Sequence, residues 1–259
     1  MLSYQHSYHA GSMADVHKHA VLSWILDYMA QKPKPLSYFE THAGRGLYDL
    51  GSVEAQKTGE AAAGIDVAER LNWFDADSPY ARALSAARKT HGRRAYPGSP
   101  LIAAELLRGE DSLRLAELHP QEVAALRGAV GLGATVEQRD GLELVLSAVP
   151  PTPGRGVLLV DPSYEVKNEY SEFPNFLRRV HRKWNVGVLI LWYPILADAR
   201  HKAMTDDLGE RLPSGLKHEV AFPPAREGHG MIGSGLYIIN PPYGLNDMLL
   251  ELGGRFAAL

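Results

Sequence analysis

One apolar run near the middle of the chain ends abruptly in an acidic side chain. Residues Gly156–Val160 are glycine, valine or leucine, and Asp161, Pro162, Ser163 and Tyr164 follow directly. A strand without polar residues is typical of a parallel sheet that helices cover on both faces. Because open α/β folds bind their ligands at the carboxyl ends of such strands, we expect Asp161 to lie in a binding site.

Strand-like and helix-like segments alternate along most of the chain. Apolar and β-branched runs predict strands over residues 36–40, 112–117, 135–139, 156–160, 186–193, 219–222 and 235–240. Helical periodicity predicts helices over residues 13–31, 101–108, 120–130, 142–148 and 173–184, the first with Ser12 as its N-cap. This alternation indicates an α/β fold with a Rossmann-like, doubly wound sheet.

One segment interrupts the alternation. Residues 50–94 are rich in Ala, Glu and Arg and show helical periodicity without a strong strand. We therefore expect a small helical insertion there, followed by a turn at residues 96–100. With 259 residues, the chain has the size of one α/β domain with an insertion, so we expect a single domain over residues 1–259.

The chain contains no cysteine, which excludes disulfide bonds and thiolate metal sites and fits a reducing cytoplasm. The first residues lack the basic and apolar segments of a signal peptide, and no apolar run approaches the roughly 20 residues that cross a bilayer. We therefore expect a cytoplasmic protein without a membrane partner.

Eleven histidines raise the question of a metal site. His17 and His19 are too close in sequence to share one face of a helix, and the His-Glu-x-x-His pattern does not occur. The nucleophile elbow of serine and cysteine hydrolases is also missing. We therefore expect neither a metal ion nor hydrolase chemistry.

The formal net charge of −3 is not typical of a protein that coats phosphate backbones. Two local clusters are nevertheless basic: Arg88, Lys89, Arg93 and Arg94 form one, and Arg178, Arg179, Arg182 and Lys183 form the other. On charge alone we interpret both clusters as solvated helix faces. A nucleic-acid site therefore has to be argued from other residues.

The loop after the first predicted strand allows a ligand to approach the backbone closely. Gly44 and Gly46 follow that strand directly, at the start of the next segment. A dinucleotide fingerprint requires a third glycine where this chain has Asp49. The loop therefore favours S-adenosylmethionine over NAD, although an ordinary tight turn would have the same composition.

Acidic residues end the next two predicted strands. Glu117 can accept both ribose hydroxyls of a nucleoside, and Asp140, followed by Gly141, can receive the amine of the cofactor's adenine. Each of them alone is better explained as a helix cap or a surface acid. Together with Asp161 and the glycine loop they converge on one edge of the sheet, which favours a shared nucleoside site.

The segment from Asp161 to Tyr164 suits the methylation of an exocyclic amine. The N6 amine of adenine is a poor nucleophile because its lone pair is delocalised into the ring. Asp161 and the Pro162 carbonyl can accept the two amine hydrogens, and Tyr164 can stack on a base turned out of its surroundings. The methyl donor is already activated, so positioning carries most of the catalysis and no metal is needed.

A second motif of this kind, Asn240-Pro241-Pro242-Tyr243, follows the last predicted strand. No cofactor-binding strands come after it, whereas the Asp161 motif has them before it in the right order. We therefore interpret residues 240–243 as a structural turn that closes the sheet.

Distinctive motifs lie along nearly the whole chain, at residues 2–11, 14–19, 41–44, 96–100, 117–120, 191–194 and 239–242. Together they resemble the RlmJ family, bacterial adenine-N6 methyltransferases that act on 23S ribosomal RNA. The resemblance implies a class I S-adenosylmethionine-dependent methyltransferase fold with a small helical insertion. It also implies methylation of an adenosine N6 in 23S ribosomal RNA that is free of ribosomal proteins.

The resemblance assigns roles to individual residues. Besides Gly44, the cofactor site is lined by His19, His42, Ser99, Glu117, Asp140 and Gly141, with Asp161 catalytic at the same site. Near the target adenosine and its RNA lie Tyr4, His6 and Lys18. The first two belong to a substrate arm over residues 1–12, whose aromatic rings suit single-stranded RNA, although packing alone would also explain them. We expect a monomer.

One departure from the family pattern is Ser163, which stands where a second proline is usual. The Pro162 carbonyl is retained, so we expect catalysis to persist with a less rigid loop. Two alternatives stay open. A DNA adenine-N6 methyltransferase would be expected to carry a larger target-recognition region, and a non-catalytic RNA-binding protein of the same fold would not need Asp161.

Overall fold

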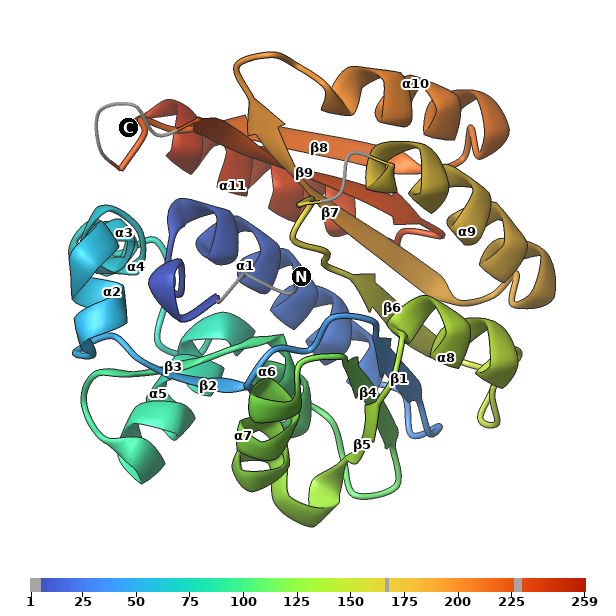
Figure 1. Cartoon of the computed structure of the whole chain (residues 1–259), viewed down its shortest axis with the longest axis horizontal. Helices are drawn as coiled ribbons and strands as arrows, with labels where there is room; N and C mark the ends of the chain where they lie inside the picture. The colour runs from blue at the N-terminus through green and yellow to red at the C-terminus, as the bar shows by residue number, and fades with distance from the viewer. Residues whose placement is uncertain (1–5, 166–167, 226–229) are drawn as a thin grey trace.

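A computed structural model of the chain describes residues 6–165, 168–225 and 230–259 and contains a seven-stranded sheet (Figure 1). The strands run in the spatial order β5-β4-β1-β6-β7-β9-β8. Their bounds are β1 Ser37–Glu40, β4 Ser112–Glu117, β5 Thr135–Gln138, β6 Gly156–Val160, β7 Val188–Leu196, β8 Leu216–Ala221 and β9 Met231–Ile239. The first five in this order are parallel, and β9 is antiparallel to both β7 and β8.

The strand order reverses between β1 and β6. From β1 the chain builds outward through β4 to β5, and it then crosses back to place β6 on the other side of β1. A ligand crevice in an open α/β sheet lies at the carboxyl end of such a reversal. All five residues of β6 are buried, as expected for a central parallel strand.

Two layers of helices cover the sheet (Figure 1). On one face lie α1 (Met13–Ala30), α6 (Ser99–Leu106), α7 (Pro120–Val130) and α11 (Leu245–Ala257). On the other lie α8 (Gly141–Ala148), α9 (Glu169–Lys183) and α10 (His201–Arg211). This arrangement confirms the expected class I methyltransferase architecture. The sequence patterns predicted neither α10 nor α11. They also placed the start of α9 at residue 173, whereas the helix begins at Glu169.

The insertion packs beside α1 and is helical, as predicted. It contains α2 (Val53–Thr58), α3 (Glu60–Ala63), α4 (Ile65–Arg70) and α5 (Pro79–His91). A two-stranded antiparallel sheet of β2 (Leu47–Asp49) and β3 (Ala95–Pro97) joins its two ends. The prediction of a turn beginning at residue 96 was wrong, because Tyr96 pairs with Tyr48. Three-residue strands leave almost no periodic signal, and this pair forms only when the insertion folds back on itself.

Helix α1 begins where the sequence predicts. The Ser12 side chain accepts a hydrogen bond from the backbone N–H of Asp15, so Ser12 is the N-cap. Gly11 has a left-handed φ of 78° and donates its N–H to the Asp15 carboxylate. The start of the helix therefore fixes Asp15 and places Lys18 one turn further along. None of the described helices is both long and apolar enough to span a membrane.

The motif at residues 240–243 lies at the edge of the sheet opposite to that of Asp161. Because β9 is antiparallel to β7, its carboxyl end meets the amino ends of the parallel strands. The Asn240 side chain donates to the carbonyls of Asn185 and Gly187. The structure thus confirms the structural interpretation of this turn.

Candidate functional site

A pocket of about 290 Å³ opens at the carboxyl ends of the parallel strands, at the reversal between β1 and β6. The described residues to which the sequence assigned individual roles all line this pocket: His6, Lys18, His19, His42, Gly44, Ser99, Glu117, Asp140, Gly141, Asp161, Pro162 and Tyr164. The second glycine of the predicted ligand loop, Gly46, is not among the lining residues and faces Leu126 instead. Tyr4 lies outside the described residues. The placement of these residues is thus a finding, whereas their individual roles stay predictions.

The pocket has two walls that different strands provide. The first wall comes from the ends of β1, β4 and β5 and includes Gly44, Glu117 and Asp140. The second wall comes from α1, the end of β6, and β7 and includes Lys18, Asp161 and Trp192. Because β6 neighbours β1, Asp161 stands where the two walls meet.

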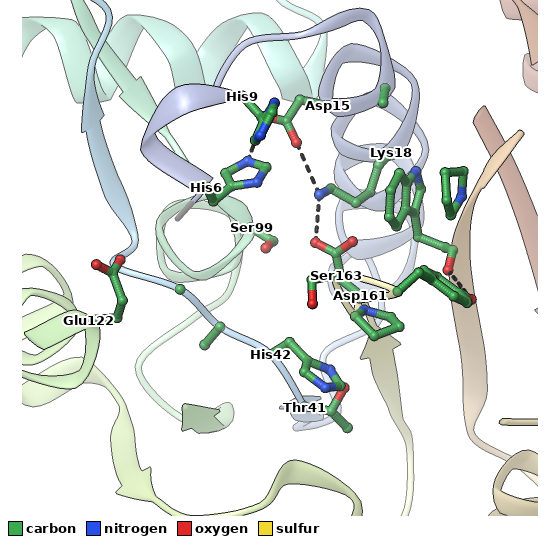
Figure 2. Close-up of a pocket in the computed structure, with 18 of the residues that line it drawn as sticks. His6, His9, Asp15, Lys18, Thr41, His42, Ser99, Glu122, Asp161 and Ser163 are labelled. Atoms are coloured by element: carbon green, nitrogen blue, oxygen red, sulfur yellow. Dashed lines mark hydrogen bonds and ion pairs between the residues drawn. The ribbon is translucent and has the colours of Figure 1, made fainter. Parts of the chain in front are cut away.

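Lys18 joins two carboxylates on the second wall (Figure 2). Its Nζ lies 2.5 Å from Asp161 Oδ2 and 3.0 Å from Asp15 Oδ1. Burial by itself would lower the pKa of Lys18, but Asp161 and Asp15 outweigh that effect and raise it. Lys18 therefore stays protonated, although its side chain is only 4% exposed.

Asp15 is the inner anchor of this group. Its Oδ2 accepts hydrogen bonds from the Gly11 N–H at 3.0 Å and from His6 Nε2 at 2.9 Å. Burial acts to raise the pKa of Asp15, but His6, Lys18 and His19 outweigh burial and hold it well below its usual value. His6, which belongs to the described part of the predicted substrate arm, is thus bound to the same carboxylate that holds Lys18.

On the first wall, Glu117 links two strand ends. Its Oε2 accepts the Gly44 N–H at 2.9 Å, and its Oε1 accepts the His119 N–H at 2.8 Å. Gly44 has a φ of 60°, and a Cβ at this position would lie 2.6 Å from the Tyr48 hydroxyl oxygen. The left-handed backbone and the nearby Tyr48 hydroxyl favour glycine at this position, as the sequence pattern predicts.

Asp140 and Gly141 begin α8 at the end of β5. Asp140 Oδ1 caps the helix by accepting the Glu143 N–H at 3.0 Å. A Cβ on Gly141 would lie 2.1 Å from the Thr41 carbonyl oxygen, so glycine allows α8 to approach the end of β1. Beside it, His42 Nδ1 is 2.7 Å from the Thr41 hydroxyl, and burial lowers the pKa of His42.

Glu40, the last residue of β1, is completely buried next to the site and was not predicted. Tyr38 donates its hydroxyl to Glu40 Oε2 at 2.9 Å, and the Ser99 hydroxyl donates to Oε1. Burial raises the pKa of Glu40 to about 8, although the hydrogen bonds from Ser99 and Tyr38 act to lower it. The rule that singled out acids at the ends of the other strands would also have found Glu40.

His19 lines the pocket and connects it to the insertion. Its Nδ1 is 2.9 Å from the Tyr96 hydroxyl, which in turn lies 2.8 Å from the Tyr80 hydroxyl. Burial lowers the pKa of His19 to about 3, so the ring is neutral at physiological pH. A neutral imidazole can face a cationic ligand group without electrostatic repulsion.

Tyr164 lines the second wall from a left-handed backbone conformation with a φ of 55°. Its hydroxyl donates to the Trp192 carbonyl at 2.9 Å, and its ring packs against Tyr170 at a centroid distance of 4.5 Å. The residue is only 8% exposed. In this arrangement Tyr164 supports Trp192 through its hydroxyl. Stacking of the Tyr164 ring on a base stays a prediction, and it requires the side chains that bury the ring to move away.

The chain is similar to a known family and to named relatives over most of its length. The family described as "Ribosomal RNA large subunit methyltransferase D, RlmJ" matches residues 33–257. Two curated relatives are both named "Ribosomal RNA large subunit methyltransferase J". The protein from Escherichia coli K12 is 39% identical over 257 residues, which cover 96% of this chain and 90% of the relative. The protein from Haemophilus influenzae Rd is 39% identical over 261 residues, which cover 97% and 92%.

A solved structure gives the same result for the fold. The crystal structure of a protein from Legionella pneumophila strain Philadelphia 1 superposes on this chain with a TM-score of 0.84. The two sequences are 34% identical, and the match covers 96% of this chain and 94% of the other. The likeness therefore extends over nearly the whole length of both chains.

Proposed function

We propose that this chain, which belongs to the RlmJ family of large-subunit ribosomal RNA methyltransferases, methylates the N6 amine of an adenosine in 23S ribosomal RNA with S-adenosylmethionine as the methyl donor. The observation that carries the proposal is the position of Asp161. Its carboxylate stands between a wall with groups suited to a nucleoside and a wall made of Lys18 and aromatic side chains. Cofactor and target base can therefore meet at Asp161.

The residues of the first wall fit S-adenosylmethionine. Glu117 keeps lone pairs beyond those that bind the two backbone N–H groups, so it can accept ribose hydroxyls. The buried Nδ1 of His119 has no hydrogen-bond partner among the described residues, and His119 lines the same wall. Gly44 itself lines this wall, where its backbone faces the pocket without a side chain. We assign cofactor binding to these groups together with His19, His42, Ser99, Asp140 and Gly141.

The bound cofactor supplies an activated methyl group, and the chain has to aim the amine at it. Asp161 and the Pro162 carbonyl accept the two N6 hydrogens, which directs the nitrogen lone pair toward the methyl carbon. Methyl transfer would break the C–S bond of the donor as the new C–N bond forms, leaving a neutral thioether. The methylated amine would then lose one proton, for which the Asp161 carboxylate would serve as acceptor. Lys18 holds one Asp161 oxygen in place, so the other oxygen is left to face the substrate.

A base must leave its stack to reach the half-buried Asp161, so we propose that the RNA is free of ribosomal proteins at the target. His6, Lys18 and the arm that contains Tyr4 contact the RNA or the target adenosine. We further propose that the enzyme acts as a monomer in the cytoplasm and without a metal ion.

The test is the transfer of labelled methyl from S-adenosylmethionine to protein-free 23S ribosomal RNA, followed by nucleoside analysis. Labelled N6-methyladenosine at one position is the expected result. Transfer to DNA instead would favour the DNA methyltransferase alternative and overturn the substrate. Binding of RNA without cofactor binding or transfer would favour the non-catalytic alternative.

A further inference from the structure

A buried chain of hydrogen bonds lies behind the second wall of the pocket. The Trp192 Nε1 is 2.9 Å from Ser234 Oγ, and Ser234 Oγ is 2.9 Å from His17 Nδ1. His17 Nε2 is in turn 2.9 Å from His218 Nδ1. These four residues connect β7, β9, α1 and β8, and Ser234 and His17 are completely buried. The sequence singled out none of them as part of a site.

The groups at both ends of this hydrogen-bond chain indicate which atoms in it donate and which accept. The indole N–H of Trp192 can only donate, so Ser234 accepts from it and has its own hydrogen left to donate to His17 Nδ1. At the other end, Nε2 of His218 faces α11, where the carbonyl of Leu249 is an acceptor. Neutral His218 then carries its hydrogen on Nε2 and accepts at Nδ1 from His17 Nε2. The two requirements agree on one arrangement, with both imidazoles protonated on Nε2.

The first member of the chain lies beside the catalytic group. The indole of Trp192 lines the pocket, and Lys18 Nζ lies 5.4 Å from the centre of its ring. Lys18 holds Asp161, and His17 precedes Lys18 on the same helix. The hydrogen bond from the indole N–H to Ser234 sets the orientation of the Trp192 ring. This orientation therefore shapes the part of the pocket that lies between Asp161 and the rest of the second wall.

We propose that Ser234 and His17 are positioning residues for the target adenosine: through one directional hydrogen-bond chain they hold the Trp192 indole as a fixed wall of the base pocket. This inference rests on the proposed function, because it assumes that the base binds against the second wall. The chain requires His218 to accept a hydrogen bond at Nδ1, so protonation of His218 breaks it. Two donors would then face each other between His218 and His17.

Burial favours the neutral form of His218 and outweighs the neighbouring groups that favour the protonated form. Burial lowers the pKa of His218, whereas the Leu249 carbonyl on α11 and the neighbouring Glu219 on its own strand act to raise it. His17 on α1 faces His218. The pKa of His17 is held well below its usual value by burial and by His218. On β9 the pairing partner of His218 is the apolar Leu236. The hydrogen-bond chain is therefore intact near pH 7, and it breaks when the pH falls below the pKa of His218 and this ring becomes protonated.

The first experiment reads the histidine tautomers of the wild-type protein by ¹⁵N NMR at pH 7.5. Both His17 and His218 are expected to be neutral and protonated on Nε2. In Ser234→Ala, His17 Nδ1 loses its donor and its nitrogen shift should move toward that of a free acceptor. A different tautomer of either wild-type ring would overturn the directional chain, and this readout does not depend on any enzymatic activity.

The second experiment is a double-mutant cycle on methyl transfer to protein-free 23S ribosomal RNA. Ser234→Ala is expected to raise the KM for RNA about five- to tenfold, with the affinity for S-adenosylmethionine unchanged. In a Trp192→Phe background, which keeps an aromatic ring without the N–H, Ser234→Ala should have no further effect. Equal effects in both backgrounds, or an unchanged KM, would overturn the proposal. Ser147→Ala is the control, because the Ser147 hydroxyl donates to the Leu144 carbonyl within α8.

The pH dependence supplies a third readout. The KM for RNA of the wild type should rise as the pH falls below the pKa of His218, whereas His218→Asn should flatten this rise because asparagine keeps an acceptor near the Nδ1 position and does not titrate. An identical profile in both proteins would contradict the inference. If wild-type protein transfers no methyl group to ribosomal RNA at all, the proposed function fails, and the tautomer measurement still decides whether the chain exists.

Discussion

Lys18 Nζ lies 2.5 Å from Asp161 Oδ2, although the two residues are 143 positions apart in the sequence. The same ammonium is 3.0 Å from Asp15, so one buried cation is shared by two carboxylates. The carboxylate at the end of β6 is thus already oriented before any substrate binds. Preorganisation of this kind is the main contribution that a protein can make when the methyl donor is already activated.

Replacing Asp161 by asparagine should separate catalysis from cofactor binding. The asparagine side chain has nearly the same size but presents an amide in place of a charged acceptor. We expect the rate of methyl transfer to fall about 100-fold or more, because the amine loses its charged acceptor and its proton acceptor. The dissociation constant for S-adenosylmethionine should stay within a few fold, measured by calorimetry.

The matched control for this change is Asp198→Asn. Asp198 is an exposed aspartate after β7 that pairs with Arg200, away from the pocket. We expect turnover of this control to equal that of the wild type. Near-normal turnover of Asp161→Asn would remove Asp161 from the catalytic role.

Replacing Lys18 by methionine should destabilise the fold in a pH-dependent way. The change leaves the buried Asp15 without its neighbouring cation, and we expect a loss of about 3–5 kcal/mol in unfolding free energy near pH 7. In the wild type the pKa of Asp15 is depressed, so its contribution is present at neutral pH and is lost as the pH falls through the folded-state pKa. The difference between the two proteins should therefore shrink below about pH 4.

Urea unfolding at several pH values measures this difference. Lys202→Met is the control, since Lys202 is exposed in the first turn of α10, and it should change stability by less than about 0.5 kcal/mol. A constant difference between Lys18→Met and wild type over the whole pH range would contradict the electrostatic explanation.

The strand ends were predictable because they depend on local pattern. Glu117 ends β4, Asp161 directly follows β6, and Asp140 lies two residues after β5. Parallel strands bring their carboxyl ends to one edge, so these three acids meet there. The same rule applied to residue 40 would have added Glu40 to the site. The periodicity of the sequence was therefore sufficient to predict the carboxyl edge of the sheet and the residues that lie along it.

Contacts between distant segments could not be predicted in this way. The pairing of Lys18 with Asp161 depends on how α1 lies across the sheet, and the pattern of α1 shows no strongly amphipathic face because most of its residues are buried. Tyr164 suggested a stacking surface, yet its hydroxyl holds the Trp192 carbonyl. A buried hydroxyl takes the partner that the packing provides, and the sequence does not contain that information.

Replacing Glu117 by glutamine should weaken cofactor binding selectively. The amide nitrogen would present a donor to one of the two N–H groups, of Gly44 or His119, and the change would remove the charge that suits ribose hydroxyls. We expect the dissociation constant for S-adenosylmethionine to rise about tenfold or more, with RNA affinity unchanged. Glu143→Gln, at a side chain that is 75% exposed on α8, should leave both constants as they are. Equal weakening of RNA binding would place Glu117 outside a dedicated cofactor site.

Replacing Glu40 by glutamine should make the stability of the protein less dependent on pH. Burial raises the pKa of Glu40 to about 8, well above the ordinary value of 4.5, so the folded state binds a proton that the unfolded state releases over this range. The stability that this proton contributes is complete below about pH 4.5 and is lost as the pH rises through 8. Glutamine keeps a neutral side chain of the same shape beside Tyr38 and Ser99 at every pH.

The free energy of unfolding of Glu40→Gln relative to wild type should therefore increase between pH 5 and pH 9, by roughly 1–3 kcal/mol. Chemical denaturation at pH 5, 7 and 9 measures it, with Glu105→Gln on the exposed side of α6 as the control that should show no trend. An opposite slope would mean that the folded protein holds Glu40 as a carboxylate. In that case the two hydrogen bonds from Ser99 and Tyr38, which act to lower the pKa, would outweigh burial.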